Sequence, residues 1–154
     1  MQDYTIALFG HRDIDDLLRV EEAFLSCVEE LFASHPCINF LIGRNGDFDE
    51  YIASAIKRIQ KKPGAERVRL ILVLPYPLAP LIYYEAYYDE IIIPEELARI
   101  HPKARITKRN QWMIRNADLV LVCLEKAQGG TADAVRYALR CQKPVQYIQK
   151  NGEE

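Results

Sequence analysis

Residues 68–74 (VRLILVL) form an apolar run in which Arg69 is the one polar residue, and Pro75 follows it directly. A run that is apolar at successive positions, and not only at alternate ones, is typical of a strand covered on both faces. Such strands belong to parallel sheets, because the crossover connections place helices on each side of the sheet. The chain therefore has to supply further strands and the helices between them.

The sequence indicates four further strands. They are the short apolar runs at residues 4–9, 37–42, 119–124 and 144–148. Between them apolar residues recur at helical spacing, as at Ile52, Ala55, Ile56 and Ile59. Strands that alternate with helices imply right-handed crossovers and a parallel sheet. We predict an α/β fold of the Rossmann-like, doubly wound kind, with a mainly parallel sheet of about five strands and helices on both faces.

Some boundaries are less regular. Residues 76–108 contain four prolines, and there we expect a helix at 81–88 and a short apolar segment at 91–93. Regular helices are expected at 108–116 and 131–140. After the first strand, Asp13 or Asp15 can cap the first helix.

Length and composition limit the class of protein. The chain has 154 residues, which suits a single domain at residues 1–150 with a short tail at 151–154. The longest apolar stretch is too short to cross a bilayer, and the N-terminus lacks the features of a secretory signal. We therefore expect a cytoplasmic protein with no membrane partner. The four cysteines and three histidines lack metal-ligand spacing, so no metal site is expected.

The charge is unevenly distributed. Residues 99–115 contain six basic residues and no acidic one, directly after an acidic stretch at 85–96. Most of these basic side chains are expected on a solvated helix face. The formal net charge of −2 argues against nucleic acid as a partner. Single-stranded DNA binding through residues 99–115 is kept as a further alternative.

Ligands of open parallel sheets bind beyond the carboxyl ends of the strands, so the loops that follow the strands are the place to look for a site. Three of these loops are rich in glycine and polar residues. The candidate ligand-binding residues in the loops after the first three strands are Gly10, His11, Arg12, Gly43, Gly46, Asp47, Asp49 and Tyr76.

Several of these residues have two interpretations. Asp47 and Asp49 either cap a helix or contact ribose hydroxyls. His11 is either a structural hydrogen-bonding group or an acid or base. Tyr76 is placed to stack on a base, whereas the tyrosines at residues 83–88 are expected to pack or to form a subunit contact.

The fourth loop and the helix before its strand supply groups suited to phosphate. Gly129, Gly130 and Thr131 precede a helix, whose N-terminus offers backbone N–H groups and a positive dipole end, although a tight turn alone also needs glycine. Arg109, followed by Asn110, can bind phosphate bidentately. The dinucleotide fingerprint and the P-loop are both missing from the sequence, so we expect no nucleotide cofactor of those kinds.

Five motifs along the chain form a familiar series. They are Phe9-Gly10-His11-Arg12, Gly46-Asp47-Phe48-Asp49, Lys108-Arg109-Asn110-x-x-Met113, Ala117-Asp118 and Gly129-Gly130-Thr131. Together they resemble the small bacterial members of the SLOG superfamily, the Rossmann-like group that joins the Smf/DprA proteins to the LOG phosphoribohydrolases. The resemblance covers almost the whole chain. It implies a pocket for a nucleotide-derived ligand, and with the tyrosine-rich segment it leads us to expect a homodimer.

The LOG enzymes carry an R-K-x-x-M segment and a P-G-G-x-G-T-x-x-E loop. Arg109 and Met113 fit the first pattern, with Asn110 in the place of the lysine. The second pattern is shortened here, and Ala134 stands where the glutamate would follow, beside Asp133. The candidate catalytic residues are accordingly Arg109, Asp133 and His11.

The sequence thus predicts a module that binds a nucleotide or nucleotide-derived small molecule at the carboxyl edge of the sheet, as a sensor or regulatory domain. The first alternative is a nucleoside 5′-monophosphate phosphoribohydrolase, which hydrolyses an N-glycosidic bond. The further alternative is single-stranded DNA binding of the Smf/DprA kind.

Overall fold

The computed structural model describes residues 3–125 and 128–148. The elements in chain order are β1 (Tyr4–Gly10), α1 (Leu17–Ser34), β2 (Ile38–Ile42), α2 (Asp47–Gln60), β3 (Val68–Val73), α3 (Leu81–Tyr87), β4 (Glu90–Ile92), the 3₁₀ turns η1 (Glu95–Arg99) and η2 (Pro102–Ala104), α4 (Arg105–Arg115), β5 (Leu119–Cys123), α5 (Gly130–Arg140) and β6 (Val145–Tyr147).

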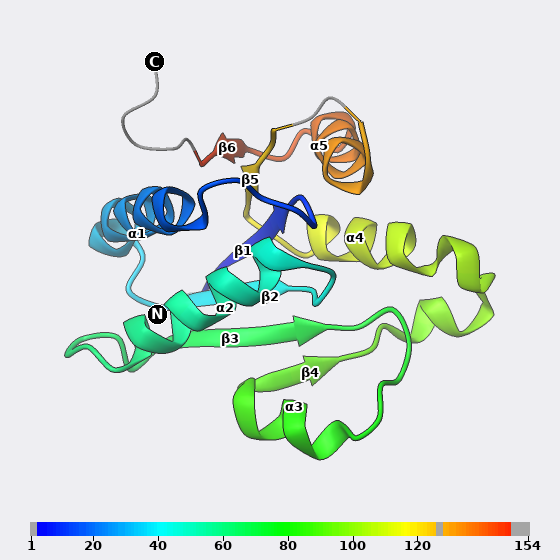
Figure 1. Ribbon diagram of the computed structural model, residues 1–154, viewed down its shortest axis with the longest axis horizontal. Coiled ribbons are helices and arrows are strands. Elements are labelled where there is room, and N and C mark those ends of the chain that lie inside the picture. Colours follow the sequence, from blue (N-terminus) through cyan, green and yellow to red (C-terminus); the bar gives the residue numbers. More distant parts are fainter. Residues whose placement is uncertain (1–2, 126–127, 149–154) are drawn as a thin grey trace.

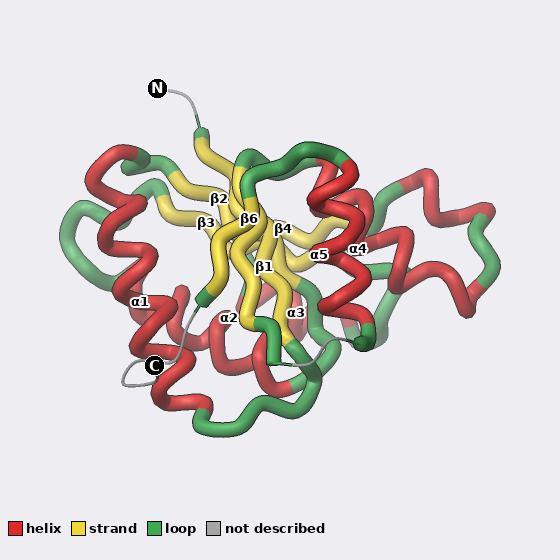
Figure 2. The backbone as a smooth tube through the Cα atoms, turned by 90° about the horizontal axis from the view of Figure 1, so that it is seen from above, coloured by secondary structure: helices red, strands yellow, loops and turns green. Residues whose placement is uncertain are grey.

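Within the described residues, six strands form one parallel sheet in the order β4-β3-β2-β1-β5-β6. Helices α1 and α2 cover one face of the sheet, and α4 and α5 cover the other (Figures 1 and 2). The predicted Rossmann-like α/β fold is confirmed. The sixth strand is β4, which overlaps the apolar segment expected at 91–93; that segment was not predicted as a strand, because three residues are too few for a strand pattern.

The central strands are largely apolar because both of their faces are buried. In β1, Ile6 and Leu8 pack toward α1 and α2, while Ala7 and Phe9 pack toward α4 and α5. The same alternation continues in the neighbouring strands, so each side of the sheet has its own core.

The direction in which the chain adds strands to the sheet reverses at β1. The chain lays down β2, β3 and β4 on one side of β1 and then crosses to β5 on the other side. The loops that follow β1 and β5 therefore leave the sheet toward opposite faces and open a crevice at the carboxyl ends of the strands. This topological switch point is where a ligand site is expected.

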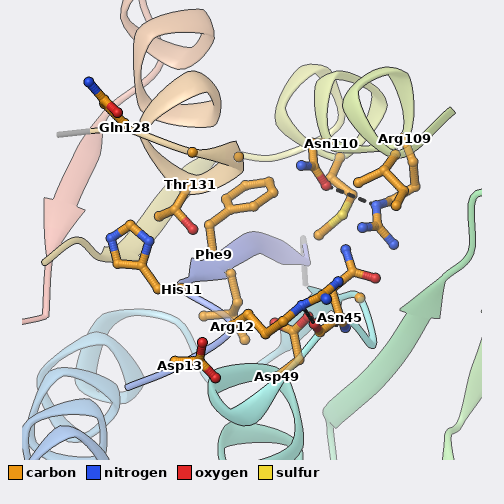
Figure 3. A pocket seen from close by; sticks show the side chains of 17 residues that line it. Phe9, His11, Arg12, Asp13, Asn45, Asp49, Arg109, Asn110, Gln128 and Thr131 are labelled. Atoms are coloured by element: carbon orange, nitrogen blue, oxygen red, sulfur yellow. Dashed lines mark hydrogen bonds between the residues drawn. The ribbon is translucent and has the colours of Figure 1, made fainter. Parts of the chain in front are cut away.

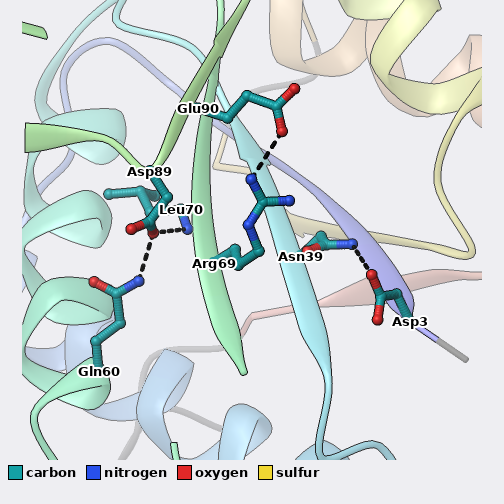
Figure 4. Close-up of polar contacts among 7 residues, drawn as sticks. All are labelled: Asp3, Asn39, Gln60, Arg69, Leu70, Asp89 and Glu90. Atoms are coloured by element: carbon teal, nitrogen blue, oxygen red, sulfur yellow. Dashed lines mark hydrogen bonds and ion pairs between the residues drawn. The ribbon is translucent and has the colours of Figure 1, made fainter. Parts of the chain in front are cut away.

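Polar contacts attach the edge strand β4 to the sheet (Figure 4). The carboxylate of Asp89 accepts hydrogen bonds from the backbone N–H of Leu70 at 2.7 Å and from Nε2 of Gln60 at 2.6 Å. Arg69 pairs with Glu90 at 2.9 Å. Part of the acidic stretch at 85–96 is thus used inside the fold.

Several boundaries differ from the prediction. Helix α1 begins at Leu17 after Asp16, so neither Asp13 nor Asp15 occupies the capping position. Helix α4 begins at Arg105 and not at residue 108, because the turn η2 feeds directly into it. The predicted tail at 151–154 lies outside the described residues. In the part of the chain that the structure describes, no helix is both long and apolar enough to span a membrane.

Candidate functional site

A pocket of about 340 Å³ lies at the carboxyl ends of β1, β2 and β5, at the switch point of the sheet (Figure 3). Loops from both halves of the chain line it, together with one face of α4 and the start of α5. Ten of the predicted site residues line this pocket: Gly10, His11, Arg12, Gly43, Asp49, Arg109, Asn110, Gly129, Gly130 and Thr131.

Three predicted residues do not line the pocket. Gly46 and Asp47 lie against the loop after β1, where the backbone N–H of Asp47 donates to the carbonyl of Arg12 at 2.8 Å. Tyr76 follows β3 and is exposed. β2 separates β3 from β1, but the end of β3 still reaches the pocket wall, because the carbonyl of Val73 accepts a hydrogen bond from Arg109 at 2.8 Å.

Other lining residues were missed by the sequence reasoning. Asn45 and Gln128 belong to the same loops as the predicted glycines, so their position in those loops could have identified them as lining residues. Asp13 was assigned to a helix cap. The apolar lining was taken for core or carried no signal; it consists of Leu8, Phe9, Ile106 and Met113.

Arg109 is a buried cation in the wall of the pocket, with 1% of its surface exposed. Its Nη1 donates to the carbonyl of Val73 at 2.8 Å, and its Nε donates to Oδ1 of Asn110 at 2.9 Å. A Cβ at Gly43 would lie 2.8 Å from Nη1, so any other residue at this position would force the buried guanidinium to shift. Two N–H groups of Arg109 are thus used in hydrogen bonds within the protein itself.

Asp49 is the buried acid that accompanies this cation. Its Oδ2 accepts a hydrogen bond from the backbone N–H of Asn45 at 2.9 Å. Burial raises the pKa of Asp49 to about 6, against the opposing effects of that hydrogen bond and of Arg109. Burial also lowers the pKa of Arg109, and the charge of Asp49 opposes that shift. The two side chains thus influence each other electrostatically in the pocket wall, without a direct ion pair.

Arg12 presents the second guanidinium of the site, at the mouth of the pocket. Its side chain is exposed, and its Nε donates to the carbonyl of Asn45 at 2.9 Å. The loops after β1 and β2 are therefore joined at Arg12 by this bond and by the bond from Asp47. Within the described residues, Nη1 and Nη2 of Arg12 have no hydrogen-bond partner.

Helix α5 begins directly at the pocket. Gly129 precedes it with a φ of 100°, a conformation that L side chains rarely adopt, and there is open space around its Cα. Gly130 and the buried Thr131 form its first turn. The N-terminal N–H groups of this helix and the positive end of its dipole therefore lie at the pocket wall.

The catalytic candidates are divided between two places. His11 and Arg109 line the pocket, and Figure 3 shows His11 beside Thr131 and Arg109 beside Asn110 on the opposite wall. Asp133 is exposed and lies outside the pocket, in a groove between α4 and α5. There its carboxylate pairs with Arg136. The carboxylates that do line the pocket are those of Asp13 and Asp49.

Three of the six basic residues of segment 99–115 are paired or buried. Both Nη2 contacts of Arg115 to the carboxylate of Glu96 are 2.8 Å long, so the acidic and basic stretches partly neutralise each other. Arg105 donates through Nε to the carbonyl of Ile100 at 2.9 Å, and Arg109 is buried.

Comparison with solved structures identifies the fold. Residues covering 94% of this chain superpose on DNA processing protein A (DprA) from Streptococcus pneumoniae with a TM-score of 0.67 and 16% sequence identity. The chain shares the DprA fold. DprA from Helicobacter pylori gives a TM-score of 0.65 at 16% identity over 98% of this chain. The chain spans 50% of the pneumococcal DprA and 68% of the Helicobacter DprA. Neither a family model nor a curated protein sequence matches the chain.

These neighbours correct the expectation about nucleic acid. The Helicobacter DprA structure is described by its single-stranded DNA binding mode. The prediction that nucleic acid is not a partner was wrong to rely on net charge, because net charge sums over the whole surface and says little about a local pocket. The expected homodimer and the cytoplasmic location stay predictions.

Proposed function

We propose that the chain binds single-stranded nucleic acid and holds one nucleotide unit in the pocket at the switch point. The observation behind this proposal is that the N-terminus of α5 and the exposed guanidinium of Arg12 border the same pocket. A helix N-terminus and an arginine are the two groups that proteins most often direct at phosphate. The fold shared with DprA, of which one member is described as binding single-stranded DNA, supports the same function.

The lining also suits the rest of a nucleotide. Phe9, Ile106 and Met113 give the pocket an apolar portion, and the amide of Asn110 lies beside them. An unpaired base needs an apolar or aromatic surface for its ring and a few polar groups for its edge. A phosphate on α5 and a base against Phe9 would use both parts of the lining.

A second candidate is binding of a free nucleotide. A volume of about 340 Å³ lies within the size range of small-molecule sites. The phosphoribohydrolase alternative has less support, because Asp133 lies outside the pocket and Arg109 is buried among protein partners.

The test measures binding of a labelled oligothymidylate by fluorescence anisotropy and of thymidine monophosphate by calorimetry. Arg12→Gln and Thr131→Val should each weaken oligonucleotide binding about tenfold, the effect of losing one hydrogen bond to a charged group. Arg19→Gln is the matched control, because Arg19 is exposed on α1 and pairs with Asp16 away from the pocket. If the oligonucleotide does not bind at low salt, or binds equally to all variants, the proposal is wrong. Binding of the monophosphate alone would favour the second candidate.

A further inference from the structure

A second depression adjoins the pocket. It lies between α4 and α5, has a volume of about 210 Å³, and shares Asn110 and Gly130 with the pocket at the switch point. The two cavities therefore adjoin at these residues. We call the second one the α4–α5 groove.

The α4 wall of the groove is polar and uncharged. Thr107, Asn110 and Gln111 line it, and their spacing of three and four residues places them on one face of the helix. The side chains of Thr107 and Gln111 make no hydrogen bond within the described residues. Hydroxyl and amide groups of this kind suit the hydrogen-bonding edge of a base.

The α5 wall is cationic. Arg136 and Arg140 both line the groove, and their separation of four residues corresponds to about 6 Å along the helix axis. The acid on this wall is Asp133, which pairs with Arg136. Arg140 also lines the groove, and none of the described ion pairs joins it to a carboxylate.

Tyr137 holds Arg140 in place. The guanidinium of Arg140 lies 5.6 Å from the centroid of the Tyr137 ring. The ring is itself fixed, because its hydroxyl accepts a hydrogen bond from Nη1 of Arg115 at 3.2 Å. An arginine that is positioned on a ring in this way loses less side-chain freedom when it binds an anion.

We propose that the α4–α5 groove is a second nucleotide subsite, in which Arg140 contacts the phosphodiester and Gln111 the base of the unit next to the one in the pocket. The strand then leaves the sheet edge at Asn110 and Gly130 and runs between the two helices. This inference rests on the proposed function and specifies the path of the strand. It requires that the protein bind two consecutive units more tightly than one.

The test compares thymidine monophosphate, which reaches only the pocket, with an oligothymidylate, which reaches both. Arg140→Gln should weaken oligonucleotide binding about tenfold and leave monophosphate binding unchanged. It should also make the slope of log K against log salt shallower by about 0.7, the contribution of one phosphate contact. Gln111→Ala should weaken the oligonucleotide only, and Arg19→Gln on α1 should change neither ligand.

The outcomes separate this inference from the proposed function. If Arg12→Gln weakens the oligonucleotide but Arg140→Gln and Gln111→Ala do not, the groove is not a subsite and the pocket proposal stands. If Arg140→Gln weakens both ligands equally, the arginine acts on the pocket and the subsite is again rejected. If the wild-type protein binds no oligonucleotide, both proposals fall.

Discussion

A buried arginine is stable only when its N–H groups and its charge find partners inside the protein. Arg109 meets this need with the carbonyl of Val73, the amide of Asn110 and the nearby charge of Asp49. Its guanidinium shapes the pocket wall and adds positive potential there. We infer that Arg109 affects a ligand mainly by shaping the pocket wall and by its positive charge.

Removing this cation should be costly. Arg109→Met leaves Asp49 buried without its counter-charge, and we expect a loss of about 3 kcal/mol in the free energy of unfolding. Lys108→Met changes the exposed neighbouring residue on the same helix and should shift stability by less than about 0.5 kcal/mol. Urea unfolding of both variants measures the difference. A small loss for Arg109→Met would mean that the buried charge of Asp49 does not depend on Arg109.

Asp49 should give the protein an unusual pH dependence. Its pKa in the fold is about 6, above the value of about 3.9 in an unfolded chain. Between these pH values the folded protein keeps a proton that the unfolded chain has lost, so the free energy of unfolding should fall as pH rises from about 4 to 6. The decrease due to this group is at most about 1.4 kcal/mol per pH unit.

Asp49→Asn removes this titration and keeps an oxygen that can accept from the N–H of Asn45. The difference in unfolding free energy between the variant and the wild type should therefore change with pH over this interval and level off outside it. Denaturation at a series of pH values measures it. Parallel profiles for the two proteins would contradict the raised pKa.

At the scale of elements, the start of α5 needs a glycine with a positive φ and also lies at the pocket. Gly129 has a φ of 100° and Gly64, in the turn after α2, has a φ of 87°. Both positions have open space around the Cα. Both glycines thus have a positive φ, but only Gly129 lies at the pocket.

This pair gives a controlled test of the helix terminus. Gly129→Ala and Gly64→Ala should each destabilise the protein by about 1–3 kcal/mol, because alanine disfavours a positive φ. Only Gly129→Ala should also weaken oligonucleotide binding, since a shift of its backbone moves the N–H groups that face the phosphate. Thermal unfolding and anisotropy on both variants provide the readouts. If the two variants bind the oligonucleotide equally well, the N-terminus of α5 does not contact the ligand.

Helix α3 shows how an element can form with little burial. None of its residues is buried, and Ile82 and Tyr83 are 71% and 73% exposed. Of the tyrosines that the sequence groups together, Tyr83 and Tyr87 face outward, whereas Tyr88, just after the helix, is buried in the core and Tyr84 packs against it. Arg44 lies over the ring of Tyr84 at 5.0 Å and Lys57 over that of Tyr87 at 5.2 Å, which attaches the helix to α2 and its preceding loop.

On the scale of the whole molecule, binding should depend only modestly on salt. The proposed path places Arg12 and Arg140 on phosphates, and two such contacts predict a slope of about −1.4 in log K against log salt. Anisotropy titrations over a range of salt concentrations measure this slope. A slope steeper than about −3 would indicate an extended basic surface, such as one built from the residues of 99–115.

The sequence by itself determined the alternation of strands and helices, because apolar runs and helical spacing are local patterns that burial on two faces imposes. It also located the loops of the site, since glycine and polar residues follow strands β1, β2 and β5. The tertiary structure alone decided which of those residues meet. Tyr76 is exposed outside the pocket lining, the packing of α4 buries Arg109, and the contact between the loops after β1 and β2 turns Asp47 away. Each of these outcomes depends on contacts between segments far apart in the chain, which no local pattern records.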